Sequence, residues 1–206
     1  MSSRSSSRRA DPARGSSASS DPEPGRLANL MGAWALGVAD RIESAASTAA
    51  GRGGRAPAAL VALHEFAGGG TIEDLRRVLG LTHSAAVRLV DALVADGHVT
   101  RRPGVGDARS VGVILTASGR AAAQRILRAR AEAVEATLAD LTQAQRGSLT
   151  ALAERLTGDL ADIRLDERRE GRPPAGGWLC RLCDFEVCGR PVGRCPAAAR
   201  AAVTST

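Results

Sequence analysis

The stretch that decides the fold is TIEDLRRVLGLTHSAAVRLVDALVADGHVTRRPGVGDARSVGVILTASGR, residues 71–120. Thr71 can cap a short helix that Gly80 ends, and Thr82 can cap a second helix after a tight turn. Apolar residues recur at helical spacing in both: Ile72, Leu75 and Val78 in the first, and Ala86, Leu89, Val90 and Leu93 in the second. Two short helices joined by a glycine-containing turn predict a helix-turn-helix.

A β-hairpin is predicted directly after the second helix. Val99 leads into a pair of arginines and a loop rich in proline and glycine. The run that follows alternates Val111, Val113 and Leu115 with smaller or outward-facing residues, which is typical of a strand with one buried face. The hairpin would form a wing beside the helix-turn-helix.

Helices are predicted on both sides of this unit. One begins at Arg26 and carries an apolar stripe, a second spans Pro57 to Ala67, a third follows Thr116 through residues 117–141, and a fourth carries a leucine stripe. The stripes are Leu27, Leu30, Met31, Trp34, Val38 and Ile42 in the first helix, and Leu149, Leu152, Leu156, Leu160 and Ile163 in the fourth. We expect a mainly α fold with a small β-hairpin wing.

The composition favours a polyanionic partner. The 206 residues include no lysine, so all 28 basic residues are arginines, and the net charge is +6. Arginine keeps its charge at any physiological pH, and such a balance points to nucleic acid. The three histidines are scattered, and there is no catalytic serine or carboxylate arrangement or phosphate loop, so we do not expect an enzyme.

The ends of the chain indicate where the protein works. Residues 1–25 are rich in serine, arginine, proline and glycine and lack the apolar core of a secretory signal, so we expect a disordered tail. No apolar run approaches the roughly 18 residues that span a bilayer. We therefore expect a cytoplasmic protein that does not bind membranes.

The order of these elements resembles the MarR family of bacterial transcription regulators. LTHSAAVRLVDALVADGHVTR (81–101) looks like the family's recognition helix leading into the wing, and GDARSVGVILTASGR (106–120) looks like its wing signature. The resemblance covers about residues 26 to 164. It implies a homodimer held by the first and the last two helices, double-stranded DNA as the partner, and a small-molecule effector near the junction of the winged and dimerisation domains.

Four residues of the second helix are candidates to face the major groove. They are Thr82, His83, Ser84 and Arg88. Arg88 is the best candidate for a bidentate contact to guanine, and a phosphate contact is its alternative. Thr82 and Ser84 suit phosphates or helix caps. The exposed Asp91 can pair with a neighbouring arginine.

The wing supplies four further candidates. We expect Arg109 to reach the minor groove or its phosphates and Asp107 to orient it, and the family resemblance implies the same for both. Arg101 and Arg102 flank the wing and are expected to contact phosphate; solvated hairpin charges are the alternative.

All four cysteines lie in CRLCDFEVCGRPVGRC, residues 180–195. The spacing is Cys-x2-Cys-x4-Cys-x6-Cys, made by Cys180, Cys183, Cys188 and Cys195. Disulfides are disfavoured in a reducing compartment, so the cluster indicates thiolate ligands of one metal centre. Zinc is preferred, an iron–sulfur cluster is the alternative, and a redox-switched set of thiols is a third interpretation.

These elements predict seven segments. They are a disordered tail (1–25), an N-terminal dimerisation helix (26–56), a winged helix-turn-helix domain (57–116), C-terminal dimerisation helices (117–165), a linker (166–177), a metal-binding segment (178–196) and a tail (197–206). The alternative function is a winged-helix protein-interaction module stapled by a structural metal, without specific DNA binding. The wing arginines favour a DNA-binding regulator.

Overall fold

The computed structural model describes residues 25–66, 70–103, 111–172 and 176–203. The chain divides into two compact units, residues 1–36 and 37–206. Helix α1 (Arg26–Ala50) begins in the first unit and ends in the second, which holds the remaining elements. The N-terminal tail that we expected lies, as far as residue 24, outside the described residues.

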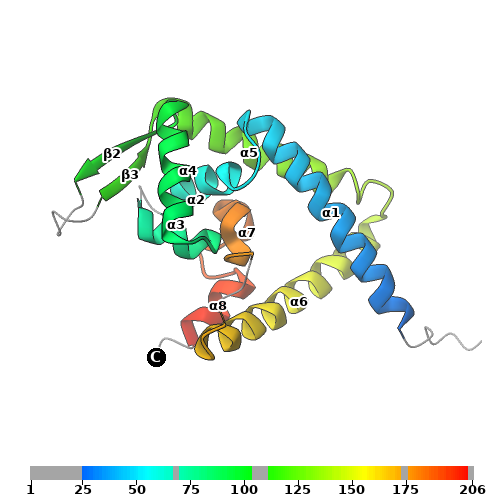
Figure 1. The fold of residues 1–206 in the computed structure, drawn as a ribbon. Coiled ribbons are helices and arrows are strands. Elements are labelled where there is room, and N and C mark those ends of the chain that lie inside the picture. The colour runs from blue at the N-terminus through cyan, green and yellow to red at the C-terminus, as the bar shows by residue number, and fades with distance from the viewer. Residues whose placement is uncertain (1–24, 67–69, 104–110, 173–175, 204–206) are drawn as a thin grey trace, which may run out of the picture. The chain divides into compact units, whose positions relative to one another are not determined.

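The second unit is mainly helical with one small sheet (Figure 1). Its elements after α1 are α2 (Ala56–Glu65), β1 (Gly70–Thr71), α3 (Ile72–Leu79), α4 (His83–Ala95), β2 (Val99–Pro103), β3 (Val111–Leu115), α5 (Ala117–Glu135), α6 (Gln143–Arg169), the 3₁₀ helix η1 (Leu179–Leu182), α7 (Phe185–Cys188) and α8 (Pro196–Val203). The predicted fold class is confirmed.

Helix α2 forms the centre of the hydrophobic core. Eight consecutive residues, from Ala56 to Leu63, are buried, so this helix has no solvent-facing side over two turns. The end of α1, helices α3 to α5 and the sheet supply the surrounding side chains, almost all of them alanine, valine, leucine and isoleucine. The core is therefore built without aromatic bulk, through close approach of helices over small residues.

The helix-turn-helix forms as its capping residues predict. The Thr71 side chain accepts a hydrogen bond from the Asp74 N–H, and the Asp74 carboxylate accepts one from the Thr71 N–H, which completes a capping box. Gly80 ends α3 in the left-handed conformation with a φ of 64°. Thr82 caps α4 by accepting from the Ala85 N–H.

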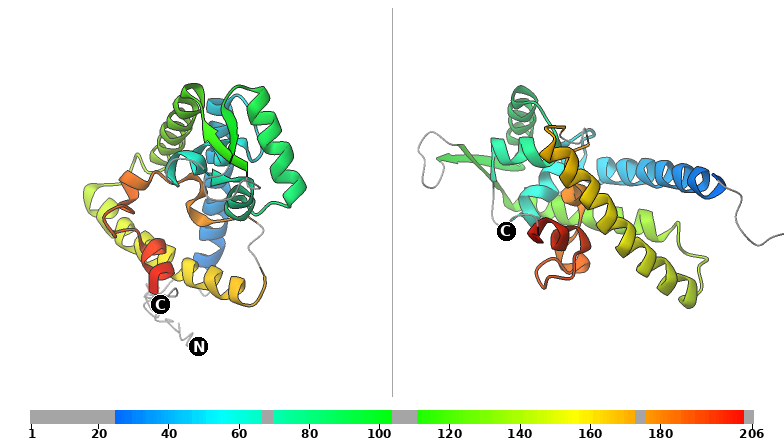
Figure 2. Two further views of the ribbon diagram at one scale, coloured as in Figure 1. Left: turned by 90° about the vertical axis from the view of Figure 1, so that its left-hand side faces the viewer. Right: turned by 90° about the horizontal axis from the view of Figure 1, so that it is seen from below.

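The wing is present as predicted, with one strand that the sequence did not reveal. Strands β2 and β3 are antiparallel, with Val99 opposite Leu115, and Figures 1 and 2 show them extending away from the helices of the second unit. Strand β1 pairs with the other edge of β3 and places Gly70 opposite Val113. We had interpreted the glycines at 68–70 only as a helix end.

The helices after the wing differ from the prediction in their bounds. Helix α5 ends at Glu135, not near residue 141, because the chain turns there: the Thr137 hydroxyl donates to the Val134 carbonyl. Thr142 then starts α6 with a second capping box. Helix α6 continues through Arg169, into the segment interpreted as a linker, and residues expected to form a C-terminal tail form α8.

Over the described ranges, no single helix is long and apolar enough to cross a membrane; only α3 and α4, bent by 111° at their turn, have the length and composition when taken together.

Candidate DNA-binding face and cysteine segment

The first two turns of α4 present a polar face to solvent. Opposite the buried Ala86, Val90 and Leu93, four of the predicted site residues are exposed: Thr82, His83, Ser84 and Arg88. The Thr82 and Ser84 hydroxyl oxygens lie 3.3 Å apart at the helix N-terminus. Hydroxyl groups and free backbone N–H groups at a helix start are well suited to bind phosphate oxygens.

Arg88 is the cation of this face that is free to bind an external anion. It is exposed, and it has no hydrogen-bond or ion-pair partner among the described residues. A guanidinium held one turn into an exposed helix can reach outward with all its donors unpaired. This geometry is compatible with either a base or a phosphate contact.

Arg101 of the wing is paired with Asp91 of α4. The Arg101 Nη2 donates to the Asp91 Oδ1 at 2.6 Å, so Asp91 has the arginine partner that the sequence suggested. The pair links β2 to α4, and it partly neutralises the positive charge of Arg101, which was expected to contact phosphate. Arg102 is exposed on β2. Asp107 and Arg109, the two candidates at the wing tip, lie outside the described residues.

The helix–wing junction is held by Thr116 and Gly119 at the start of α5. The Thr116 hydroxyl donates to the Gly97 carbonyl at 2.8 Å and accepts from the Gly119 N–H at 3.0 Å. Gly119 has no room for a side chain: a Cβ there would lie 2.0 Å from the His98 carbonyl oxygen. The close approach of α5 to His98 fixes the base of the hairpin against the end of α4.

Residues 51–110 match the model of the MarR family. This part of the chain resembles the MarR family, and its fold is a winged helix. The match covers α2 to β2, which includes the whole polar face of α4. No curated protein sequence matches the chain.

Solved structures show that the MarR fold extends beyond this stretch. The chain is similar to RV1404 from Mycobacterium tuberculosis, with a TM-score of 0.58 and 17% identity over 68% of this chain and 96% of that one. It is similar to wild-type MarR from E. coli, with a TM-score of 0.53 and 21% identity over 63% and 96% of the two chains. It is also similar to CouR from Rhodococcus jostii RHA1 bound to p-coumaroyl-CoA, with a TM-score of 0.50 and 21% identity over 64% and 91%.

The cysteine segment of the chain, residues 178–195, is a series of tight turns. The Cys183 N–H donates to the Cys180 carbonyl at 3.1 Å, which closes the first turn. Asp184 caps α7 by accepting from the Val187 N–H. Gly189 and Gly193 then adopt φ angles of 71° and 73°, and the Arg194 N–H donates to the Gly189 carbonyl at 2.9 Å. These turns return the chain to Cys195.

The four thiols lie close enough to affect one another's ionisation. Cys183 and Cys195 both raise the pKa of Cys180, and Cys195 and Cys183 both raise the pKa of Cys188. Cys195 is buried, and the other three are half-buried. Within the described ranges, no three His, Cys, Asp or Glu side chains are arranged as ligands of one metal ion. The thiols are thus gathered but not oriented as a finished ligand set.

The interaction between Cys180 and Cys183 shifts the pKa values of these two thiols in opposite directions. The hydrogen bond from Cys180 lowers the pKa of Cys183 to about 6, with help from the charges of Arg130 and Arg181 and against the effect of burial. The same hydrogen bond, together with burial, raises the pKa of Cys180. Burial raises the pKa of Cys188. Cys183 therefore has more thiolate character at neutral pH than Cys180.

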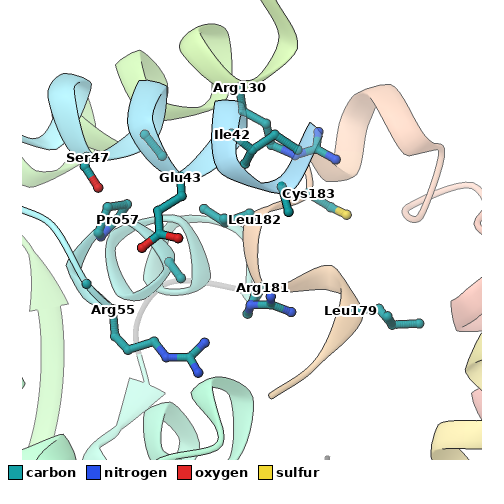
Figure 3. Close-up of a pocket in the computed structure, with 14 residues that line it drawn as sticks. Ile42, Glu43, Ser47, Arg55, Pro57, Arg130, Leu179, Arg181, Leu182 and Cys183 are labelled. Atoms are coloured by element: carbon teal, nitrogen blue, oxygen red, sulfur yellow. The ribbon is translucent and has the colours of Figure 1, made fainter. Parts of the chain in front are cut away.

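A cavity of about 490 Å³ lies beside the segment (Figure 3). The end of α1, the start of α2, Arg130 of α5 and η1 form its walls. Burial, followed by the charges of Arg55 and Arg164, lowers the pKa of Arg181. Figure 3 shows the Glu43 carboxylate, from α1, and the Arg181 guanidinium, from η1, among the groups that line the cavity. No residue was assigned to this cavity from the sequence, because its charged residues are far apart along the chain.

Proposed function

We propose that this chain is a transcription regulator that binds duplex DNA as a homodimer. The observation that carries the proposal is the exposed polar face at the start of α4, which adjoins the arginine-bearing hairpin in one rigid junction. The major groove admits one α-helix with its N-terminal end leading, and a wing beside it meets the backbone or the minor groove. The match to the MarR family over these elements supports the assignment.

The dimer is supported by an exposed apolar face on α6. Its residues recur at spacings of three and four, and each is about half exposed: Leu152 (56%), Leu156 (54%), Leu160 (42%) and Ile163 (55%). Apolar side chains are also exposed along the first part of α1, at Leu27, Leu30, Met31 and Trp34. A run of this size on a monomer is typical of a protein interface. A second copy of the chain would cover the α6 face and present two copies of α4 to successive half-sites.

A binding-site selection from random duplex oligonucleotides tests the function. We expect enrichment of a palindromic sequence. The logarithm of the association constant for this sequence should fall linearly with the logarithm of the salt concentration, because arginine–phosphate contacts release counterions. Half-sites centred about 10 base pairs or a multiple apart would reflect the symmetry of the dimer. A chain that ignores duplex DNA in dilute salt would instead be the protein-interaction module.

Arg88→Ala tests the recognition helix. We expect the affinity for the selected duplex to fall about 10- to 100-fold, because a bidentate arginine–guanine contact contributes about 1–3 kcal/mol. Loss of preference at one base pair indicates a base contact, whereas a uniform loss with a smaller salt slope indicates a phosphate contact. Arg128→Ala, an exposed arginine of α5, is the matched control. Equal affinities of the two variants would contradict the role of α4, and fluorescence anisotropy measures both.

The cavity is the proposed site of a small-molecule effector. CouR, which shares the fold, was solved bound to p-coumaroyl-CoA. In this chain, Arg130 and Arg181 line a cavity large enough for a small organic anion. An anion would offset the burial of the Arg181 guanidinium and its repulsion by Arg55 and Arg164. The ligand would lie between the end of α1 and the winged helix, where it can alter their packing.

The cysteine segment is the proposed site of one metal ion, with zinc preferred and an iron–sulfur cluster as the alternative. Zinc and iron–sulfur clusters both prefer cysteine thiolates as ligands, and four neighbouring cysteine thiols can supply them. Elemental analysis and a visible spectrum of anaerobically purified protein decide between them. Colourless protein with one zinc per chain indicates zinc, and a brown protein with a broad visible band indicates iron and sulfide.

A further inference from the structure

Helix α6 is connected to the winged helix through the cysteine segment. Among the described elements, the one against which α6 packs extensively is α8, which directly follows Cys195. The opposite side of the segment packs on α2 through η1. Figures 1 and 2 show α7 and α8 between the helix-turn-helix and α6. The segment therefore joins the helix proposed to form the dimer to the domain proposed to bind DNA.

On its inner side, the segment is bound to the helices that carry the helix-turn-helix. The Trp178 N–H donates to the Val78 carbonyl of α3 at 2.8 Å, and the Phe185 N–H donates to the Glu65 Oε2 of α2 at 2.7 Å. Trp178 and Phe185 both pack edge-on against Phe66, with centroids 5.5 and 4.8 Å away. Three of the four aromatic residues of the chain meet at this contact.

On its outer side, the segment is bound to α6. The Arg164 Nη1 donates to the Gly177 carbonyl at 2.8 Å, and the Arg168 guanidinium stacks on Trp178 at 5.4 Å. Arg200 of α8 pairs with Asp162 of α6 at 3.4 Å. Gly177 thus lies between α6 and α3. A Cβ at this position would lie 2.4 Å from the Val78 carbonyl oxygen.

The segment has little core of its own to hold this shape. Within residues 178–195, the buried apolar side chains are Phe185 and Cys195, while Val187 and Val192 are 83% and 69% exposed. Short segments with so few buried residues usually depend on a metal or a disulfide for a fixed fold. The thiols are gathered at the point where such a crosslink would act.

We propose that one zinc ion, bound by Cys180, Cys183, Cys188 and Cys195, turns residues 178–195 into a clasp that sets α6 against the winged helix. Binding replaces four thiol protons with one Zn²⁺, releases up to four protons to solvent and involves no change of oxidation state. The resulting centre carries a net charge of −2. Arg190, whose Nη1 lies 3.9 Å from the Cys180 sulfur, is placed to balance part of it.

The expected effect of the clasp on DNA binding rests on the proposed function. Loss of zinc would free the segment from α2 and α3, so that α6 and the winged helix would no longer be held at one spacing. In a dimer, this spacing sets the distance between the two copies of α4, so metal-free protein would bind a two-site duplex more weakly. Zinc would thereby control DNA binding without contacting DNA.

The first experiment measures the site and the clasp in the full-length chain without DNA. Metal-free protein is titrated with Co²⁺, which should give thiolate charge-transfer and tetrahedral d–d bands that saturate at one ion per chain, and then with Zn²⁺, which should remove them. Hydrogen exchange should show the amides of Trp178 and Phe185 protected in the zinc form and exchanging at least about tenfold faster without metal. Absent Co²⁺ bands would overturn the site, and equal protection in both forms would overturn the clasp.

A matched glycine pair separates the metal site from its docking. Gly177→Ala forces a side chain into the α3 backbone, whereas the adjacent Gly176→Ala meets only the end of the Arg181 side chain, 3.9 Å away. We expect both variants to bind one Co²⁺, and only Gly177→Ala to lose protection at Trp178. In a Trp34→Phe background, Trp178 is the only indole, so its fluorescence reports the same undocking. Identical behaviour of the two variants would contradict the clasp.

The duplex found by selection then tests the coupling. We expect zinc-loaded protein to bind it at least about tenfold more tightly than metal-free protein or Cys188→Ser, with Gly177→Ala as weak as the metal-free form. Equal affinities of the loaded and metal-free forms would overturn the coupling. If no form binds DNA while zinc still protects Trp178, the proposed function fails and the clasp stands.

Discussion

Gly119→Ala is expected to unfold or severely destabilise the winged helix. A methyl group at this position would lie 2.0 Å from the His98 carbonyl oxygen and 3.0 Å from a methyl of Leu115. The obstacle is mainly backbone, so α5 would have to move away from the hairpin and break the Thr116 hydrogen bonds to Gly97 and His98. Overpacking against backbone costs about 3 kcal/mol or more, a large share of the stability of an ordinary domain.

Thermal unfolding followed by circular dichroism measures this effect. We expect the Tm to fall by about 10 °C or more, or the variant to be recovered only as aggregate. The control is Gly147→Ala in α6, where a Cβ meets no atom within 4 Å and where alanine favours a helix by up to about 1 kcal/mol. A Gly119→Ala protein as stable as its parent would show that the approach of α5 to His98 is not tight in solution.

Leu156→Glu is expected to convert the proposed dimer to a monomer. Leu156 lies in the middle of the exposed α6 stripe. Because a two-fold interface repeats each residue, one substitution would bury two unpaired carboxylates. The desolvation of such charges weakens association strongly, so we expect the dimer dissociation constant to rise at least about 100-fold. The affinity for a two-site duplex would fall with it, because each monomer would hold only one half-site.

Analytical ultracentrifugation reports the oligomeric state over a range of concentrations. Ala151→Glu adds the same charge at an exposed position of α6 away from the stripe, and we expect it to remain dimeric. Leu156 is exposed in the monomer, so neither change should lower the far-ultraviolet helical signal of the chain. A Leu156→Glu protein that stays dimeric would mean that another surface joins the two copies.

Local chemistry made the helix-turn-helix predictable. Thr71, Gly80 and Thr82 each act within one turn of their own position, and Thr116 caps α5 in the same local way. Residue type and spacing were therefore enough to place the helices and the wing. Strand β1 was missed because two residues carry no periodicity. The end of α5 was missed because apolar spacing continues through Leu138, while the turn is made by backbone hydrogen bonds and the Thr137 hydroxyl, which have no sequence periodicity.

The candidate sites also divide into features set by local sequence and features that depend on contacts between distant residues. The exposed face of α4 follows from helical periodicity alone, and the cysteine spacing marks its segment without any fold. The docking of that segment was not predictable, because Trp178 binds Val78 and Phe185 binds Glu65 across about half the chain. The cavity was missed for the same reason: Arg55, Arg130 and Arg181 meet only in the folded unit.

The ion pair between Asp91 and Arg101 has a consequence for selectivity. In the proposed complex, Asp91 brings a negative charge close to the sugar–phosphate surface, where it repels every duplex alike. Before Arg101 can bind a phosphate, its guanidinium must break the ion pair with the Asp91 carboxylate. The pair therefore reduces indiscriminate attraction to polyanions, and it leaves the contacts made by base edges to decide where the protein stays bound.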